Sequence, residues 1–129
     1  MLGVCRQTRL ITGYQVTSSY DLASFQAFAD GLAPAERYCS DGLLTYQQLI
    51  WPNDAPHIVS RGKDETHTIE SINANLRTYL GRLARASRCF SRTLQALEEA
   101  VRLFIYHHNR RTRFIQRHPQ FRHALPLSF

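Results

Sequence analysis

The strongest constraint on the fold is a long amphipathic pattern in the second half of the chain. From about Thr66 to Ala86, apolar residues recur at the spacing of one helix face, which predicts a long helix. A second such helix is predicted from a cap at Ser91 or Thr93 to about His108. Both need another surface to cover their apolar faces. The two stripes contain Ile69, Ile72, Leu76, Leu80 and Leu83, and then Leu94, Leu97, Val101, Phe104 and Ile105.

Short strands in the first half can supply that surface. Short runs of β-branched and aromatic residues alternate there with helical patterns. The resulting order, β-α-β-α-β-α-α, predicts an α/β fold with a largely parallel sheet, whose ligands bind at the carboxyl ends of the strands. The predicted strands are residues 9–16, 37–40 and 57–60, and the predicted helices between them are residues 20–32, capped by Ser18 or Ser19, and 43–50.

The charges are divided unequally along the chain. Residues 1–76 contain 5 basic and 8 acidic side chains, a net charge of −3, whereas residues 77–129 contain 11 arginines and 2 glutamates, a net charge of +9. The planar guanidinium group suits phosphate contacts, although a biased base composition of the gene would also raise the arginine content. We therefore predict a polyanionic partner, such as a nucleic acid, for the second half.

The remaining composition is uninformative about chemistry. No apolar run is long enough to span a membrane, and the sequence contains no HExxH, no GxSxG and no phosphate-binding glycine loop. Cys5, Cys39 and Cys89 show no paired spacing and are interpreted as reduced thiols of a cytoplasmic protein.

Asp41 is the first candidate for a functional residue. It follows the strand predicted at residues 37–40 and precedes Gly42, within the segment YCSDG. This is a common position for a turn residue, and it is also where α/β folds place ligand-binding side chains. Metal-assisted hydrolysis of a phosphodiester requires several converging carboxylates, so a second acidic residue is needed.

Glu70 is the best second candidate, because it lies near the start of the long predicted helix. Asn73 and Arg77 follow it at helical spacing and share its stripe. On these grounds alone, we favour the interpretation that Glu70 complements the helix dipole. His67 precedes Glu70 by one helical turn and could share a metal with it, although a solvated histidine is the favoured interpretation.

The ordered segments resemble the second half of InsB-type transposases, members of the first-numbered insertion-sequence family of bacterial DDE transposases. The resemblance runs from about Thr8 to Asn109 and includes YCSDG, HIVSR and the stretch LGRLARASRCFSRTLQALEEAV. Its most specific part is the motif T-x-x-I-E-x-x-N-x-N-L-R at residues 66–77. A basic R-L-x-R and a C-F-S-x-[ST]-L segment follow it in register, at residues 82–85 and 89–94.

The resemblance implies a ribonuclease H-like fold that cuts and joins DNA ends with Mg²⁺ or Mn²⁺. It assigns Asp41 as the second and Glu70 as the third catalytic, metal-binding carboxylate. It also implies double-stranded DNA as partner, a homo-oligomeric assembly, and a location at the bacterial nucleoid in the cytoplasm. The residues then expected to contact DNA are Asn73, Arg77, Arg82, Arg85, Arg88, Arg92, Arg110, Arg111 and Arg113.

One departure from the family pattern concerns the first catalytic aspartate. The family carries it on the first strand, whereas residues 1–5 resemble the end of the second strand and residues 9–16 the third. Asp21, Asp30 and Glu36, the acidic residues before Asp41, fall on or around the first predicted helix. We therefore expect a partial catalytic domain over residues 1–109 that lacks its first strand, followed by a basic, aromatic tail at residues 110–129.

Three functions remain open from the sequence. The first is a DDE transposase, incomplete as a catalyst on its own. The second is a non-catalytic DNA-binding fragment that regulates transposition, and the third is an α/β domain with no role on DNA. Without a central first strand, residues 9–16 and 37–40 either pair directly or leave open sheet edges, so the isolated chain is expected to be marginally stable or to self-associate.

Overall fold

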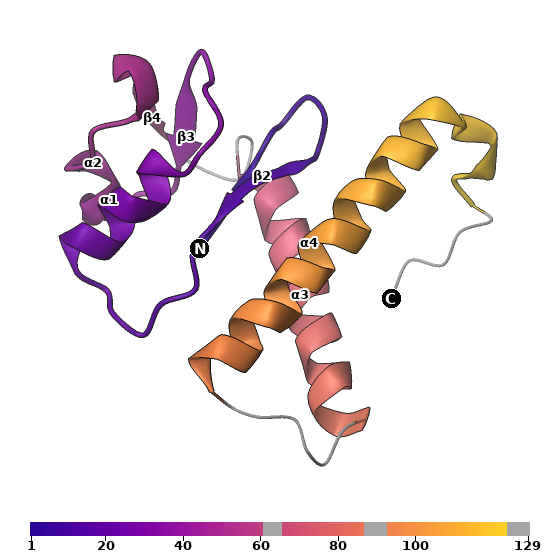
Figure 1. The fold of residues 1–129 in the computed structure, drawn as a ribbon. Coiled ribbons are helices and arrows are strands. Elements are labelled where there is room, and N and C mark those ends of the chain that lie inside the picture. The colour runs from indigo at the N-terminus through magenta and orange to yellow at the C-terminus, as the bar shows by residue number, and fades with distance from the viewer. Residues whose placement is uncertain (61–65, 87–92, 124–129) are drawn as a thin grey trace.

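The computed structural model describes residues 1–60, 66–86 and 93–123, with the backbone alone for residues 82–86. Figure 1 shows short strands and two short helices on one side, and two long helices on the other. The strands are β1 (Leu2–Val4), β2 (Ile11–Tyr14), β3 (Tyr38–Ser40) and β4 (His57–Val59). The helices are α1 (Leu22–Asp30), α2 (Leu44–Gln47), α3 (His67–Ala86) and α4 (Leu94–Arg117), with the short 3-10 helices η1 (Pro52–Asp54) and η2 (Pro119–Phe121).

The prediction of one largely parallel sheet is wrong for the described residues, which form two separate two-stranded sheets. β1 pairs antiparallel with β2, whereas β3 pairs parallel with β4. The physical reason lies in the connections. A tight turn over residues 5–10 can join only antiparallel strands, whereas the longer path through α2 and η1 allows β4 to return parallel to β3.

The outer edges of these sheets lack a strand partner within the described residues, because β2 pairs with β1 alone and β3 with β4 alone. The structure therefore contains the open edges that were one of the two expected outcomes, and β2 does not pair with β3. Part of the β2 edge is covered by side chains of α4 instead: the amide of Asn109 makes two hydrogen bonds to the backbone of Ile11.

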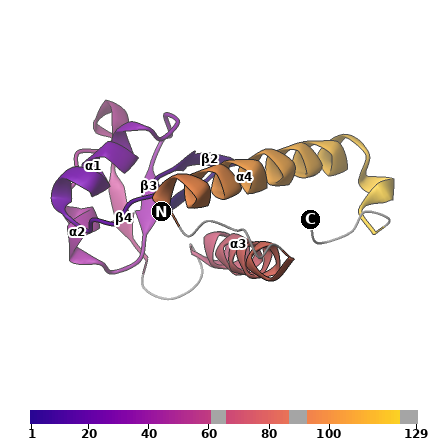
Figure 2. The same cartoon turned by 60° about the horizontal axis from the view of Figure 1, so that its bottom comes forward.

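The larger core lies where α3 and α4 cover the β1–β2 hairpin, and Figures 1 and 2 show these helices beside it. α3 packs against β1 and against α4, and α4 also packs against β2. Ile72 and Phe104, both predicted to face the core, are buried there, and Phe104 is fully buried. The middle of each apolar stripe thus packs against the hairpin, as the sequence pattern predicted, whereas Leu94 at the start of the second stripe is exposed.

A second core joins α1, α2 and η1 at the other end of the molecule. Phe25 and Ala29 of α1 pack there against Leu49 and Trp51. Leu32, just after α1, packs against this core and also lies over the paired glycines Gly3 and Gly13 of the hairpin. A Cβ atom at Gly3 would lie 2.2 Å from Leu32 Cδ2, so the absence of side chains at this pair lets the two cores meet.

The predicted helices exist, but several of their ends differ. Asp21, rather than Ser18 or Ser19, caps α1, because its Oδ1 accepts a hydrogen bond from the Ser24 amide at 2.9 Å. α2 is shorter than residues 43–50. Thr93 caps α4 as expected, through a bond from the Ala96 amide to its hydroxyl oxygen at 3.2 Å.

α4 continues beyond the expected end at His108 and reaches Arg117. The helix therefore crosses the boundary expected at residues 109/110 and includes the first part of the segment expected as a basic, aromatic tail. Arginine has high helix propensity, and Pro119 then ends the helix because a residue before proline is disfavoured in helical conformation.

Candidate functional site

Asp41 lies directly after β3, as the sequence predicted, and its side chain is exposed. Its Oδ1 accepts a hydrogen bond from the amide of Leu43 at 3.2 Å, which stabilises the turn leading into α2. Burial of the Tyr46 ring raises the pKa of its hydroxyl, and the nearby Asp41 carboxylate raises that pKa further. Asp41 is therefore accessible to a ligand while its backbone is held at the end of the strand.

A hydrogen bond and a stack of rings hold the strand end that precedes Asp41. The Ser40 hydroxyl lies 2.7 Å from Nε2 of His57, across the parallel pair of β3 and β4. The His57 ring stacks on Trp51 at 4.8 Å between centroids, and Trp51 stacks on Tyr38 at 5.0 Å. Burial lowers the pKa of His57, so the neutral imidazole is favoured in this position. The hydrogen bond ties the last residue of β3 to the first residue of β4, and the ring stack packs the start of both strands against Trp51.

Sequence reasoning missed this arrangement of Ser40, His57 and Trp51. His57 begins β4 in register with Tyr38, so the two rings lie on neighbouring strands. The signal in the sequence was the aromatic and polar content of the short segments YCS and HIV, but their register depends on the pairing of two strands that are far apart in the chain.

Glu70 lies in the first turn of α3 with its side chain exposed. Its amide donates to the carbonyl of Thr66 at 3.0 Å, and its Oε1 accepts from the Thr66 hydroxyl at 3.4 Å. This local geometry suits a carboxylate near a helix N-terminus, and it leaves the second carboxylate oxygen available. His67, also exposed, lies one turn earlier.

The two carboxylates lie on different elements, Asp41 directly after β3 and Glu70 in the first turn of α3. Among the described residues, the carboxylates of Asp41 and Glu70 accept local hydrogen bonds, from Leu43 and from Thr66. Across residues 1–60, 66–86 and 93–123, no group of three or more His, Cys, Asp and Glu side chains lies close enough to hold a metal ion.

The side chains predicted to contact DNA fall on two helices. On α3, Asn73 is half-buried and Arg77 is exposed. Arg82 and Arg85 also belong to α3, but their side chains lie outside the described part of the structure, and so do Arg88 and Arg92 as whole residues.

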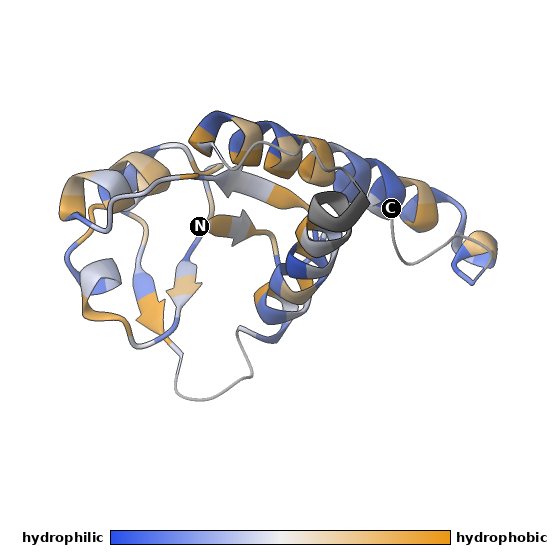
Figure 3. Ribbon diagram, turned by 90° about the horizontal axis from the view of Figure 1, so that it is seen from below, coloured by the Kyte–Doolittle hydropathy of each residue, from blue (hydrophilic) through white to orange (hydrophobic). Residues whose placement is uncertain are grey.

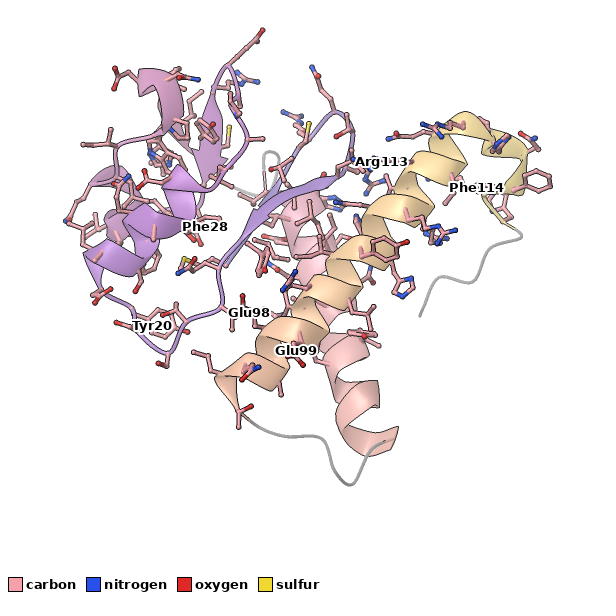
Figure 4. The ribbon with its side chains drawn as sticks, viewed as in Figure 1. Tyr20, Phe28, Glu98, Glu99, Arg113 and Phe114 are labelled. Carbon is pink, nitrogen blue, oxygen red and sulfur yellow. The ribbon has the colours of Figure 1, made fainter. Side chains whose placement is uncertain are left out.

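Three further predicted cations lie on the C-terminal half of α4. Arg110 and Arg113 are exposed, and Arg110 donates from Nη1 to the hydroxyl of Tyr106 at 3.2 Å. Arg111 is half-buried, and its Nε is buried without a hydrogen-bond partner among the described residues. Figure 4 shows Arg113 near one end of α4 and Glu98 and Glu99 near the other. The helix therefore carries its positive charge at the end farthest from its acidic residues.

Contacts between α4 and the hairpin fix the position of this basic segment. Asn109 accepts from the Ile11 amide at 2.8 Å and donates to the Ile11 carbonyl at 3.0 Å. Gln116 donates to the carbonyl of Thr8 at 2.7 Å, and His108 Nε2 lies 3.0 Å from the carbonyl of Arg9. Sequence reasoning missed these contacts, because no local pattern shows which polar side chains of a helix meet a distant strand.

The described cysteines, Cys5 and Cys39, are free thiols, in agreement with the sequence interpretation, while Cys89 lies outside the described residues. A search of the described helices for long apolar segments found none that could cross a membrane.

Comparison with known protein families gives a match to the IS1 transposase family over residues 28–111. The matched region contains Asp41, Glu70, both long helices up to Arg111, and the strands β3 and β4. Searches of curated protein sequences and of solved structures found no significant match. Because the family match spans well over half of the 129 residues, the chain belongs to the IS1 transposase family.

Proposed function

We propose that this protein is a DDE-type transposase that cuts and joins the DNA ends of an insertion sequence, with a ribonuclease H-like catalytic domain. Membership of the IS1 transposase family indicates a function in DNA transposition. The observation that carries the proposal is that the matched region, residues 28–111, covers both Asp41 and Glu70, the two residues that the sequence resemblance assigns as catalytic carboxylates. Transposition acts on chromosomal DNA, so we expect the protein at the bacterial nucleoid.

Asp41 and Glu70 act in this proposal as two carboxylates at the reacting phosphodiester. Both side chains are exposed, which allows a DNA phosphate to approach them. Asp41 follows a strand end that the bond between Ser40 and His57 holds in place. Glu70 is on a helix anchored by the buried Ile72. Rigid supports of this kind suit a reaction that depends on positioning.

DDE transposases use divalent metal ions, and the oxygen atoms of Asp41 and Glu70 are the type of donor that Mg²⁺ or Mn²⁺ prefers. Their number does not fit a complete centre, since the described residues contain no group of three potential ligands. A further oxygen donor must join these two carboxylates before a divalent ion can be held tightly.

DNA contacts are assigned to the basic second half of the chain. Arg77 on α3 and Arg110, Arg111 and Arg113 on α4 would bind phosphates, with Asn73 beside Arg77. Arg82, Arg85, Arg88 and Arg92 are proposed for the same role from the sequence. A homo-oligomer that brings two DNA ends together is also part of the proposal.

A second function is favoured by the incomplete set of carboxylates. The chain could bind DNA and regulate transposition without cutting it, using the same basic helices. Measurements of DNA binding and of DNA cleavage distinguish the two functions, because only cleavage requires Asp41 and Glu70.

The test measures nicking of supercoiled DNA with Mn²⁺ present, in the parent protein and in Asp41→Asn and Glu70→Gln. We expect slow nicking by the parent and a loss of at least about 100-fold in each variant, since each removes a charge that acts at the reacting phosphate. Normal DNA binding without nicking by any of the proteins establishes the regulatory function instead. Binding that does not weaken as salt concentration rises would contradict both functions.

A further inference from the structure

We propose that the C-terminal end of α4 forms a stacking site for unpaired DNA bases, in addition to any contacts with duplex phosphates. This inference rests on the proposed function in DNA transposition. It assigns the site to Phe114, His118 and Phe121, named below the aromatic cluster.

The local fold brings the three rings of the aromatic cluster together. Phe114 lies in the last turns of α4, His118 is the residue after the helix, and Phe121 ends η2. The ring centroids of Phe114 and His118 are 4.8 Å apart, and those of Phe114 and Phe121 are 6.1 Å apart. Backbone bonds hold this turn, from the His118 amide to the Phe114 carbonyl at 2.9 Å and from the Phe121 amide to the His118 carbonyl at 3.0 Å.

The rings of the aromatic cluster are accessible. Phe114 is 41% exposed and Phe121 is 45% exposed, and neither belongs to the two apolar cores. Phe104 is fully buried and gains the full stabilisation that burial gives an aromatic ring. Phe114 and Phe121, which are partly exposed to water, gain less of it. The exposed part of each ring is therefore available to a ligand.

The charge around the aromatic cluster selects the class of ligand. Residues 100–129 contain six arginines and no aspartate or glutamate. Arg113, Arg117 and Arg122 flank the rings and are exposed. Figure 4 shows Arg113 and Phe114 at the same end of α4, distant from Glu98 and Glu99. A second copy of this chain would bring further arginines against this surface, whereas a polyanion would neutralise them.

Unpaired DNA is the polyanion that matches both features. In a duplex, the flat faces of the bases are stacked on one another, so aromatic side chains cannot reach them except at an end. Single-stranded binding sites combine cations along the backbone with aromatic rings on which bases stack. Three cations flanking three clustered rings give this combination within the ten residues 113–122.

The test compares binding of a labelled single-stranded oligonucleotide and of a blunt-ended duplex of the same sequence by fluorescence anisotropy. We expect Phe114→Ala and Phe121→Ala to weaken single-strand binding by roughly 5- to 100-fold, the factor for losing one stacked base, and to change duplex binding by less than about twofold. Phe114→Tyr keeps an aromatic ring and is expected to bind the single strand as tightly as the parent. Tyr20→Ala is the matched control, because Tyr20 is 84% exposed and lies far from Phe114 and Arg113 in Figure 4.

Several results overturn the inference. One is unchanged affinity for the single strand in both alanine variants. Another is an equal loss of affinity for the single strand and for the duplex. A third is a loss that appears only in binding to anionic lipid vesicles or in self-association of the protein. Because both rings are exposed, the variants should melt at the parent's temperature. If the parent binds neither form of DNA, the proposed function itself fails, whereas normal duplex binding with unaffected single-strand binding contradicts only the stacking site.

Discussion

At the scale of single residues, His57 links strand pairing to the packing of the second core. Its Nε2 bonds to the Ser40 hydroxyl, and its ring stacks on the buried Trp51. The parallel pair of β3 and β4 has only three residues in each strand, so these side-chain contacts add to a short ladder of backbone bonds. His57 therefore supports the strand end that carries Asp41, from a distance of 16 positions in the sequence.

His57 also makes the stability of the protein depend on pH. Burial lowers the pKa of His57 in the folded state below the ordinary value of about 6.5. The imidazole of His57 therefore binds a proton more readily in the unfolded chain than in the folded protein. The stability that neutral His57 contributes is fully present above the unfolded pKa and is lost as pH falls below it toward the folded pKa. We expect His57→Phe, which keeps a ring against Trp51, to show a smaller fall in melting temperature between about pH 7.5 and pH 5.5 than the parent.

The control for this prediction is His67→Phe, because His67 is exposed on α3. It should retain the pH dependence of the parent. Identical pH dependence in the parent and in His57→Phe would show that another group is responsible.

At the scale of elements, α4 both covers the hairpin and carries the basic surface. Its first half contributes Val101 and Phe104 to the buried face, and its second half presents arginines. Figure 3 shows this change along the helix as a transition to predominantly hydrophilic residues. The side chain of Asn109 lies at the transition and bonds to both backbone groups of Ile11 in β2. The contact fixes the direction in which the basic half leaves the hairpin.

Asn109→Ala is expected to destabilise the protein by about 1–3 kcal/mol, because it leaves the polar backbone groups of the buried Ile11 without their partner. Chemical denaturation measures this difference. Asn75→Ala removes an exposed amide from α3 and should change stability by less than about 0.5 kcal/mol. Equal effects of the two substitutions would mean that the Asn109 contact contributes nothing specific.

At the scale of the whole molecule, two small sheets and two apolar cores meet through Leu32 and the glycine pair. Within the described residues, the sheet edges of β3 and β4 that face away from each other carry no strand partner. Unpaired backbone groups along such edges can pair with another chain. The sheet arrangement therefore favours contacts between copies.

We expect the isolated protein to self-associate, or to be only marginally stable, under conditions where a closed α/β domain remains monomeric. Sedimentation velocity over a range of protein concentrations would show an increasing average sedimentation coefficient. A single monomeric species with a cooperative thermal transition at every concentration would contradict this expectation.

The sequence alone determined the presence of each long helix, since the repeats through Ile72 and through Phe104 correspond to buried faces of α3 and α4. It also located Asp41 at a strand end and Glu70 in a first helical turn, and it identified the family later found by comparison. Such features follow from local periodicity and from short motifs. Helix ends were less predictable, and α4 extended to Arg117 because arginines and a later proline, rather than apolar spacing, decide where it stops.

Only the tertiary structure decided how the strands pair and which polar residues meet. Three contacts join residues whose proximity no local sequence pattern predicts. They are the antiparallel pairing of β1 with β2, the bond between Ser40 and His57, and the contact of Asn109 with Ile11. The same holds for the aromatic cluster, because Phe114 and Phe121 come together only when the chain turns at Pro119. Local sequence sets which elements form, and packing across them sets which side chains act together.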